Sequence, residues 1–153
     1  MAVTGIYACP VEGVDRPLQI GVASGKLISV EFPETPAADA TETHALLDRF
    51  IAYFEGAEDD FRDVEIGLTV PTDHRTVLET LRKVPYGQSV TVERLTTMTP
   101  GLDAEETVDQ ETVRTALQEN PLPIVCPGHR VRDGPSAAPA SVTARLRQIE
   151  DLP

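Results

Sequence analysis

The first seventy residues alternate apolar and polar positions in the way that β-strands do. Residues 18–32 alternate on both sides of a turn signal at Gly25-Lys26, which predicts a hairpin. Apolar side chains then recur at helical spacing before Glu55-Gly56 ends the pattern. The elements predicted for this part are strands at 5–10, 19–23, 27–32 and 64–70 and a helix at 44–54.

The rest of the chain has helical spacing of apolar residues, interrupted by proline and glycine. Pro85 ends a first helix, Thr99-Pro100-Gly101 a second and Asn120-Pro121 a third. Ser89 or Thr91 is expected to cap the second helix, which runs to about Met98. The other predicted helices are 76–84, 105–119 and 142–150, and a short buried strand at 124–126 precedes the last one. Three helices followed by an extended stretch indicate a helix-turn-helix or winged-helix module.

The change of pattern near residue 70 predicts two domains in an α/β fold of the α+β type: a strand-rich unit at 1–70 and a helical unit at 71–153. A length of 153 residues and a hydrophobic content of 41% suffice for a buried core. The chain has neither a run of eighteen apolar residues nor a basic start, so we expect a cytoplasmic protein without a membrane span.

Cysteine use and charge narrow the function classes further. Cys9 and Cys126 lie far apart without C-x-x-C spacing, and His44 and His74 show no ligand spacing, so we expect no disulfide, metal site or cofactor. The formal net charge is −12, with two lysines against eleven arginines. This acidic, lysine-poor composition indicates a protein that works in concentrated salt, where repulsion between like charges is screened within about 3 Å at 1 M. The alternative is an acidic protein of a mesophile with a GC-rich genome.

The charge is unevenly spread along the chain. Residues 1–70 hold thirteen acids and four bases (net −9), and residues 71–153 hold twelve acids and nine bases (net −3). If either part meets a polyanion, the second is therefore the better candidate.

Short motifs in the second part, in a fixed order, carry a family resemblance. They are Val84-Pro85-Tyr86-Gly87-Gln88, Asn120-Pro121-Leu122-Pro123-Ile124, His129-Arg130-Val131 and a terminal helix that ends in Glu150. In order and spacing they resemble the methylated-DNA–protein-cysteine methyltransferases, also called alkylguanine-DNA alkyltransferases. The first part, with Tyr53-Phe54-Glu55-Gly56 closing its helix, is similar to the family's amino-terminal domain. The resemblance implies a small strand-rich domain followed by a winged-helix DNA-binding domain.

The resemblance also implies a chemistry. In the family, a cysteine between proline and histidine takes the alkyl group from a flipped-out guanine and is consumed. A histidine, a water and a glutamate lower the pKa of that cysteine. A helix-turn-helix binds the DNA, and an inserted arginine fills the space that the extruded base leaves.

This chain departs from the family at three functional positions. Gly128 stands where the acceptor cysteine is expected, Glu111 where the inserted arginine is expected and Val92 where an aromatic helps to rotate the nucleotide. The scaffold positions that are kept are Pro85, Gly87, Asn120, Pro121, His129 and Glu150. The resemblance therefore implies a relative without the acceptor group, and it puts DNA binding itself in question.

The remaining candidates each have a functional and a structural interpretation. Cys126 is either a displaced nucleophile, facing the same pocket from roughly 6 to 7 Å deeper along a strand, or a small buried hydrophobe. His129 is a vestigial activator or a hydrogen-bonded structural histidine. Glu150 is its partner or a solvated acid at a helix end. Asn120 is expected to be a residue at a helix end or turn whose side chain ties the active-site strand down.

Five arginines form a candidate phosphate-binding set; alternatively, they balance the acids around them. They are Arg114, Arg130, Arg132, Arg145 and Arg147. Tyr86 is expected to pack half-buried on its turn.

The leading hypothesis is an alkyltransferase-like protein that binds alkylated guanine in double-stranded DNA without transferring the alkyl group. The lesion then passes to repair proteins, and the protein acts as a monomer without a cofactor. The first alternative is an enzyme that uses Cys126 as acceptor or for other thiol chemistry. The second is a protein-interaction or structural module that does not bind DNA.

Overall fold

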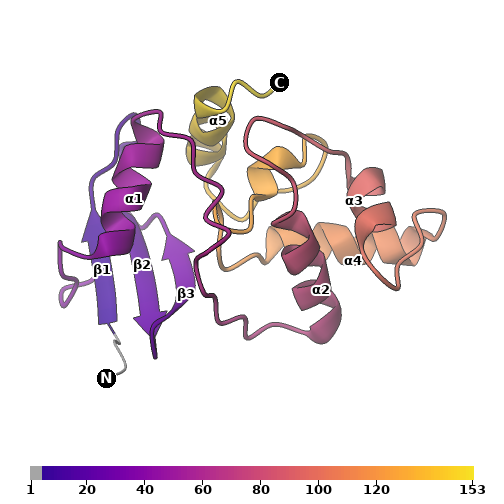
Figure 1. The fold of residues 1–153 in the computed structure, drawn as a ribbon, viewed down its shortest axis with the longest axis horizontal. Coiled ribbons are helices and arrows are strands. Elements are labelled where there is room, and N and C mark those ends of the chain that lie inside the picture. The colour runs from indigo at the N-terminus through magenta and orange to yellow at the C-terminus, as the bar shows by residue number, and fades with distance from the viewer. Residues whose placement is uncertain (1–4) are drawn as a thin grey trace.

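The computed structural model describes residues 5–153. They form an antiparallel sheet of three strands and five α-helices, joined by loops and a 3₁₀ turn (Figure 1). The α/β fold class is therefore confirmed. In chain order the elements are β1 (Gly5–Cys9), β2 (Leu18–Ala23), β3 (Lys26–Glu31), α1 (Ala45–Phe54), α2 (Thr72–Leu81), α3 (Val92–Met98), α4 (Thr107–Gln118), a 3₁₀ turn (Gly128–Arg130) and α5 (Ala140–Ile149).

The sheet has the order β1-β2-β3, and the predicted hairpin forms its second and third strands. The two residues of the turn are Ser24 and Gly25, with φ of 54° and 76°. Positive φ at both positions matches the right-handed twist of the flanking strands. Helix α1 packs against the sheet (Figure 1). Its buried residues include Leu47 and Phe50.

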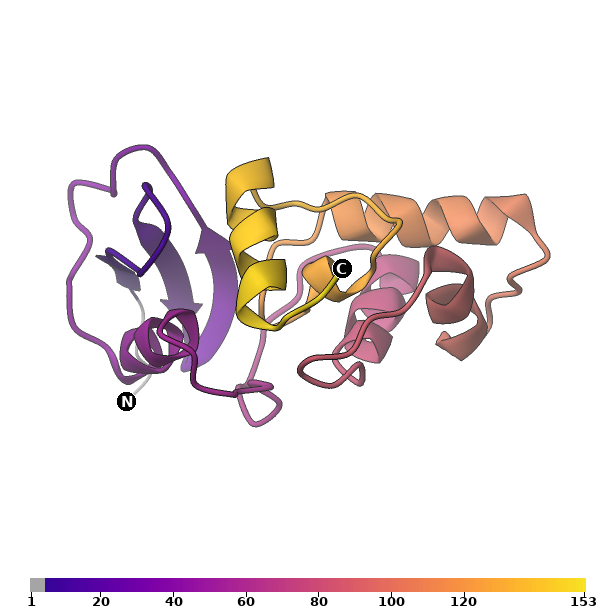
Figure 2. The same cartoon turned by 90° about the horizontal axis from the view of Figure 1, so that it is seen from above.

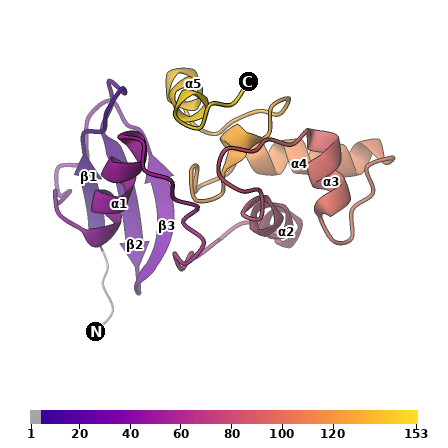
Figure 3. The same ribbon diagram turned by 45° about the horizontal axis from the view of Figure 1, so that its top comes forward.

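The helices of the second part form their own layer beside the sheet. The segment around Pro100 ends α3, as predicted. Helix α2 begins at Thr72 and ends at Leu81, four and three residues earlier than expected, so it ends before Pro85 is reached. Helix α5 lies between the sheet and the group of α2, α3 and α4 (Figures 2 and 3). No helix among residues 5–153 combines the length and the apolar character that a membrane span requires.

Two predicted strands are wrong. Residues 64–70 form no strand and make only an isolated bridge, in which the Leu27 N–H donates to Glu65 O and the Gly67 N–H donates to Leu27 O. The segment at 124–126 is a series of turns, and Ile124 has φ of 81°. The positive φ of Ile124 and the turn hydrogen bond from the Cys126 N–H to Leu122 O are incompatible with a strand, so this apolar run is buried without pairing.

Candidate functional site

The loop from Asn120 to Gly128 is held in place by a buried side-chain amide. Asn120 Nδ2 donates to Cys126 O at 2.8 Å, and Asn120 Oδ1 accepts from the Leu122 N–H at 2.9 Å. The Gly128 N–H donates to the same Cys126 carbonyl at 2.8 Å and begins the 3₁₀ turn. The position of Asn120 therefore matches the fastening role expected from the sequence.

Gly128 is buried, yet nothing around it requires a glycine. Its φ lies outside the left-handed range that favours glycine. A Cβ at this position would lie 3.7 Å from Asn120 Nδ2 and 3.9 Å from a methyl carbon of Leu117, which are ordinary contacts. The backbone and its neighbours would thus accept a side chain that begins with a Cβ, as cysteine does.

Glu150, directly after α5, is the centre of a buried polar cluster. Its Oε1 accepts from Arg130 Nε at 2.8 Å and from the Gly87 N–H at 3.0 Å, and its Oε2 contacts His129 Nε2 at 2.5 Å. The Tyr53 hydroxyl also donates to Oε2. Burial by itself raises the pKa of Glu150, but the hydrogen bonds from His129 and Arg130 outweigh it and lower the pKa to about 2. Glu150 is therefore ionised at neutral pH.

His129 follows Gly128 in the chain and contacts this carboxylate. Burial lowers its pKa, and the hydrogen bond to Glu150 opposes that shift only in part, so the ring is neutral at neutral pH. An ionised carboxylate only accepts, so the proton of the neutral ring is on Nε2. The other nitrogen, Nδ1, is buried and has no hydrogen-bond partner among residues 5–153. His129 thus presents an unprotonated ring nitrogen beside the residue that lacks a side chain.

Arg130 is a buried structural cation, which corrects its place among the expected phosphate-binding residues. Only 1% of its surface is exposed. Its guanidinium donates to Glu150 as described above, to Val84 O at 2.7 Å and to Asp60 Oδ1 at 3.2 Å. It has no freedom to reach a phosphate, because removing it from these partners would leave a buried carboxylate unpaired.

The other residues expected at the pocket do not gather around Gly128 in one cluster. Val92 is buried at the start of α3, where its backbone N–H donates to Asp133 Oδ1 at 2.7 Å. Glu111 is exposed on α4. Arg114 is half-buried on the same helix and donates to Asp133 O at 3.3 Å.

The remaining arginines of the expected set are occupied to different degrees. Arg147 donates to His129 O and Val131 O, and Arg145 donates to Phe54 O and Glu12 O, so both bind the fold together. Arg132 is exposed and contacts Ser89 Oγ. Arg114 and Arg132 are held less firmly. Within the described residues, each side chain donates one hydrogen bond, to Asp133 O and to Ser89 Oγ respectively, and each keeps exposed surface.

Cys126 is fully buried in the turns before Gly128. Because the segment is not a strand, the expectation that Cys126 faces the pocket from deeper along an extended chain does not hold. Burial raises the pKa of its thiol to about 12. A thiol of that pKa is almost entirely protonated at neutral pH, and the thiolate is the reactive form.

Sequence reasoning missed two members of the cluster, Tyr53 and Asp60. Tyr53 lies on the buried side of α1, and its hydroxyl reaches Glu150 from 97 positions away in the chain. Asp60, from the acidic run at 58–60, accepts hydrogen bonds from both Arg130 and the Tyr86 N–H. The sequence offered one signal for these residues, a tyrosine at a position that the helical spacing of α1 buries. Their hydrogen-bond partners are set by tertiary packing, which the sequence does not report.

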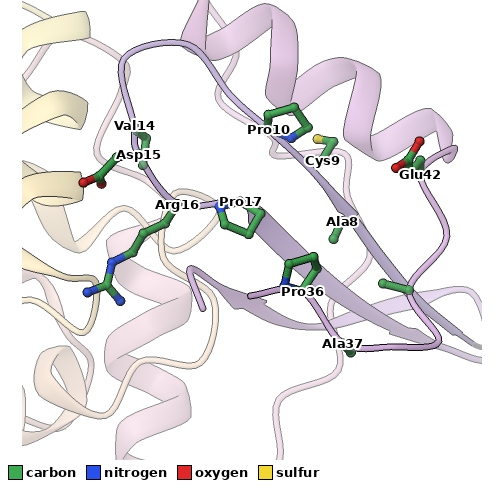
Figure 4. A pocket seen from close by; sticks show the side chains of 11 residues that line it. Ala8, Cys9, Pro10, Val14, Asp15, Arg16, Pro17, Pro36, Ala37 and Glu42 are labelled. Carbon is green, nitrogen blue, oxygen red and sulfur yellow. The ribbon is translucent and has the colours of Figure 1, made fainter. Parts of the chain in front are cut away.

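A cavity of about 380 Å³ lies away from this cluster, beside β1 (Figure 4). Its walls are mainly alanine and proline, with the thiol of Cys9 on one side. In Figure 4, Asp15 and Arg16 lie at one end and Glu42 at the other. Burial raises the pKa of the Cys9 thiol, so this cysteine is also a weak nucleophile.

Comparison with known proteins shows which proteins this chain is similar to. No model of a known protein family matches the chain. A methylated-DNA–protein-cysteine methyltransferase of Methanopyrus kandleri is 33% identical over 98 residues, which are 63% of this chain and 70% of the relative. A protein of the same name from Metallosphaera sedula is 28% identical over 132 residues, covering 83% of this chain and 76% of the relative.

Solved structures agree in fold at lower identity. A variant of the Mycobacterium tuberculosis O6-methylguanine methyltransferase superposes with a TM-score of 0.74 at 20% identity, covering 97% of this chain and 92% of that one. The O6-methylguanine-DNA methyltransferase of Pyrococcus kodakaraensis gives 0.70 at 19% identity, covering 97% and 100%. With the fold and the Methanopyrus relative in agreement, the chain belongs to the methylated-DNA–protein-cysteine methyltransferase family.

Proposed function

We propose that this family member recognises alkylated guanine in DNA without accepting the alkyl group itself. The family to which the chain belongs is one of DNA-repair methyltransferases. A Mycobacterium tuberculosis relative of the same fold is described in complex with DNA, with a TM-score of 0.71 and 21% identity. Binding of the lesion by this chain, followed by transfer to repair proteins, is the function that this relationship favours.

One observation carries the proposal: the activating groups are present where the acceptor is absent. His129 Nδ1 is unprotonated and has no partner among the described residues, and Glu150 holds the opposite nitrogen. Gly128 beside it has no nucleophile, although its surroundings would accept a Cβ. The side chain of a glycine is a hydrogen atom bound to carbon, which cannot attack an alkyl group. A bound alkylated guanine would therefore remain intact.

The alternative acceptor, Cys126, is disfavoured by its environment. Its side chain is fully buried and the pKa of its thiol is about 12. Attack on a methyl group requires both a thiolate and an open path to the substrate. Alkyl transfer to Cys126 would therefore need the loop from Asn120 to Gly128 to open.

The decisive experiment combines intact-protein mass spectrometry with binding. The wild type and Gly128→Cys are incubated with duplexes that carry O6-methylguanine or plain guanine, and Gly128→Ala serves as the matched control. We expect no added mass on the wild type or on Gly128→Ala, and one methyl group on Gly128→Cys, mapped to the new thiol. Fluorescence anisotropy should show that all three proteins prefer the methylated duplex.

Two results would overturn the proposal. A methyl adduct on Cys126 of the wild type would make the chain an enzyme. Equal or undetectable binding of both duplexes by all three proteins would remove the lesion-reading function. That second result would favour the protein-interaction module, which has one observation of its own: α4 and the turn before it expose Glu105, Glu106 and Glu111.

A further inference from the structure

A basic hollow on the second part of the chain lies outside the cluster around Gly128. It has a volume of about 450 Å³, and its charged lining residues are Arg62, Glu79, Arg82 and Lys83. Three cations against one acid give a local charge of +2 in a chain whose net charge is −12. No residue of α4 lines it, so it is distinct from the helix that carries Glu111.

The cations of the basic hollow form no ion pair with a carboxylate of the described residues, unlike Arg49 and Arg130. Asp63 acts on Arg82 electrostatically but forms no ion pair with it. Among residues 5–153, the ion pairs involve Arg49, Arg130 and two histidines, and none involves Arg62, Arg82 or Lys83. No ion pair therefore neutralises their positive charge, although acids outnumber bases by almost two to one in the whole sequence.

Two of the three cations are held in place by main-chain carbonyls. Arg82 donates through one terminal nitrogen to Phe61 O at 2.7 Å and to Val64 O at 3.0 Å. Arg62 donates to Lys83 O at 3.1 Å. These bonds fix the guanidiniums without cancelling their charge. The Nε–H of Arg82 is buried and has no acceptor among the described residues.

The size and charge of the basic hollow determine what it can bind. A volume of about 450 Å³ falls within the range of about 300 to 1,000 Å³ typical of small-molecule sites. The hydroxyls of Thr76 and Thr80 donate to carbonyls within α2, so the cations must supply the donors. The C-terminal end of α2 contributes about half a negative charge, less than the local excess of two positive charges.

We propose that the basic hollow binds the phosphate groups of a small anionic ligand. Guanidinium groups suit phosphate oxygens because they present paired donors in a fixed geometry. Repulsion from the rest of the acidic chain is screened within about 8 Å at physiological ionic strength, so the nearby cations dominate. This site is independent of the proposed recognition of alkylated guanine.

Isothermal titration calorimetry of the full chain with sodium pyrophosphate, with inorganic phosphate and with a plain duplex tests this site. Lys83→Gln removes a cation whose side chain holds no part of the fold, and Glu79→Gln removes the opposing acid. Arg94→Gln, an exposed cation on α3 outside the hollow, is the matched control. We expect saturable pyrophosphate binding that weakens about fivefold in Lys83→Gln, tightens about threefold in Glu79→Gln and stays within about twofold in Arg94→Gln.

The other outcomes are equally informative. Duplex binding that depends on Lys83, without binding of either free anion, would overturn the small ligand and assign the site to a nucleic-acid backbone. Absence of saturable binding for all three probes would overturn the site altogether. So would equal responses of Lys83→Gln and Arg94→Gln, because the effect would then follow net charge and not the basic hollow.

Discussion

Gly128 differs in backbone conformation from a glycine that the fold requires. Gly25 has φ of 76° in the hairpin turn, whereas the φ of Gly128 is outside that range and its Cβ position is free of close contacts. We expect Gly25→Ala to destabilise the protein by about 1 kcal/mol, because an alanine is strained at positive φ. Gly128→Ala should leave the stability unchanged or raise it by about 0.5 kcal/mol.

Urea denaturation of the two variants and the wild type measures this difference. A loss in Gly128→Ala as large as in Gly25→Ala would show that position 128 needs a glycine for structural reasons. The missing acceptor cysteine would then be explained by a structural requirement for glycine at position 128.

Glu150 makes stability depend on pH in a predictable direction. Its pKa is about 2 in the folded protein and ordinarily 4.5, so the unfolded chain takes up the proton first as the pH falls. Its contribution, about 3 kcal/mol, is fully present above pH 4.5 and declines as the pH approaches 2. His129, with its lowered pKa, adds a loss that begins near its ordinary value of 6.5.

Urea denaturation between pH 7 and pH 3 checks this expectation in the wild type, with Glu150→Gln as control. The variant should lose about 3 kcal/mol at pH 7, since Arg130 keeps its buried charge without its main partner. More than about half of the Glu150 contribution should be gone by pH 3. A difference between the two proteins that does not change with pH would contradict an ionised Glu150.

At the scale of single elements, α3 depends on one side chain for its start. The Thr91 hydroxyl accepts from the Arg94 N–H at 3.0 Å, which satisfies a donor that the first turn leaves open. Thr91→Ala should therefore lower the free energy of unfolding by about 1 kcal/mol. Thr91→Ser keeps the oxygen and should cost less than about 0.5 kcal/mol. Similar losses in both variants would attribute the effect to packing of the threonine methyl group.

Elements that depend on neighbouring residues were predictable, and those that depend on distant partners were not. The hairpin around Gly25, the Thr91 cap and the end of α3 before Pro100 follow from adjacent residues. Residues 64–70 have strand-like composition, but only Leu27 pairs with them, so no ladder forms. Whether a strand forms depends on a partner edge, and the sequence of one segment does not report it.

The candidate site shows the same division. His129 and Glu150 were found through a motif of known spacing, and the structure joins them at 2.5 Å. Tyr53 and Asp60 reach the cluster from the first part of the chain, because α1 packs where its tyrosine meets the end of α5. The burial of Arg130 was missed for the same reason. A boundary between two domains at residue 70 stays a prediction, as does a halophilic origin.

The net charge of −12 determines the affinity of the whole molecule for DNA and how that affinity depends on salt. Proteins that neutralise several phosphates release counterions and lose affinity steeply as salt rises. Here Arg130 is buried, Arg145 and Arg147 bind carbonyls, and Glu111 is exposed on α4. Of the five arginines expected to contact phosphates, Arg114 and Arg132 therefore remain to release counterions, while salt screens the repulsion. We therefore expect weak duplex binding with a shallow or inverted dependence on salt.

Glu111→Arg should strengthen this binding, because one substitution changes the local charge by two units on a helix that is expected to face DNA. We expect a gain of about tenfold, near 1.4 kcal/mol, at this exposed position. Fluorescence anisotropy with methylated and plain duplexes across salt measures both quantities, and Glu111→Gln separates the removed acid from the added cation. Tight wild-type binding with a steep negative salt dependence would contradict this prediction, since it would require many more phosphate contacts than Arg114 and Arg132 provide. Weaker binding by Glu111→Arg than by Glu111→Gln would instead show that α4 does not approach the phosphates.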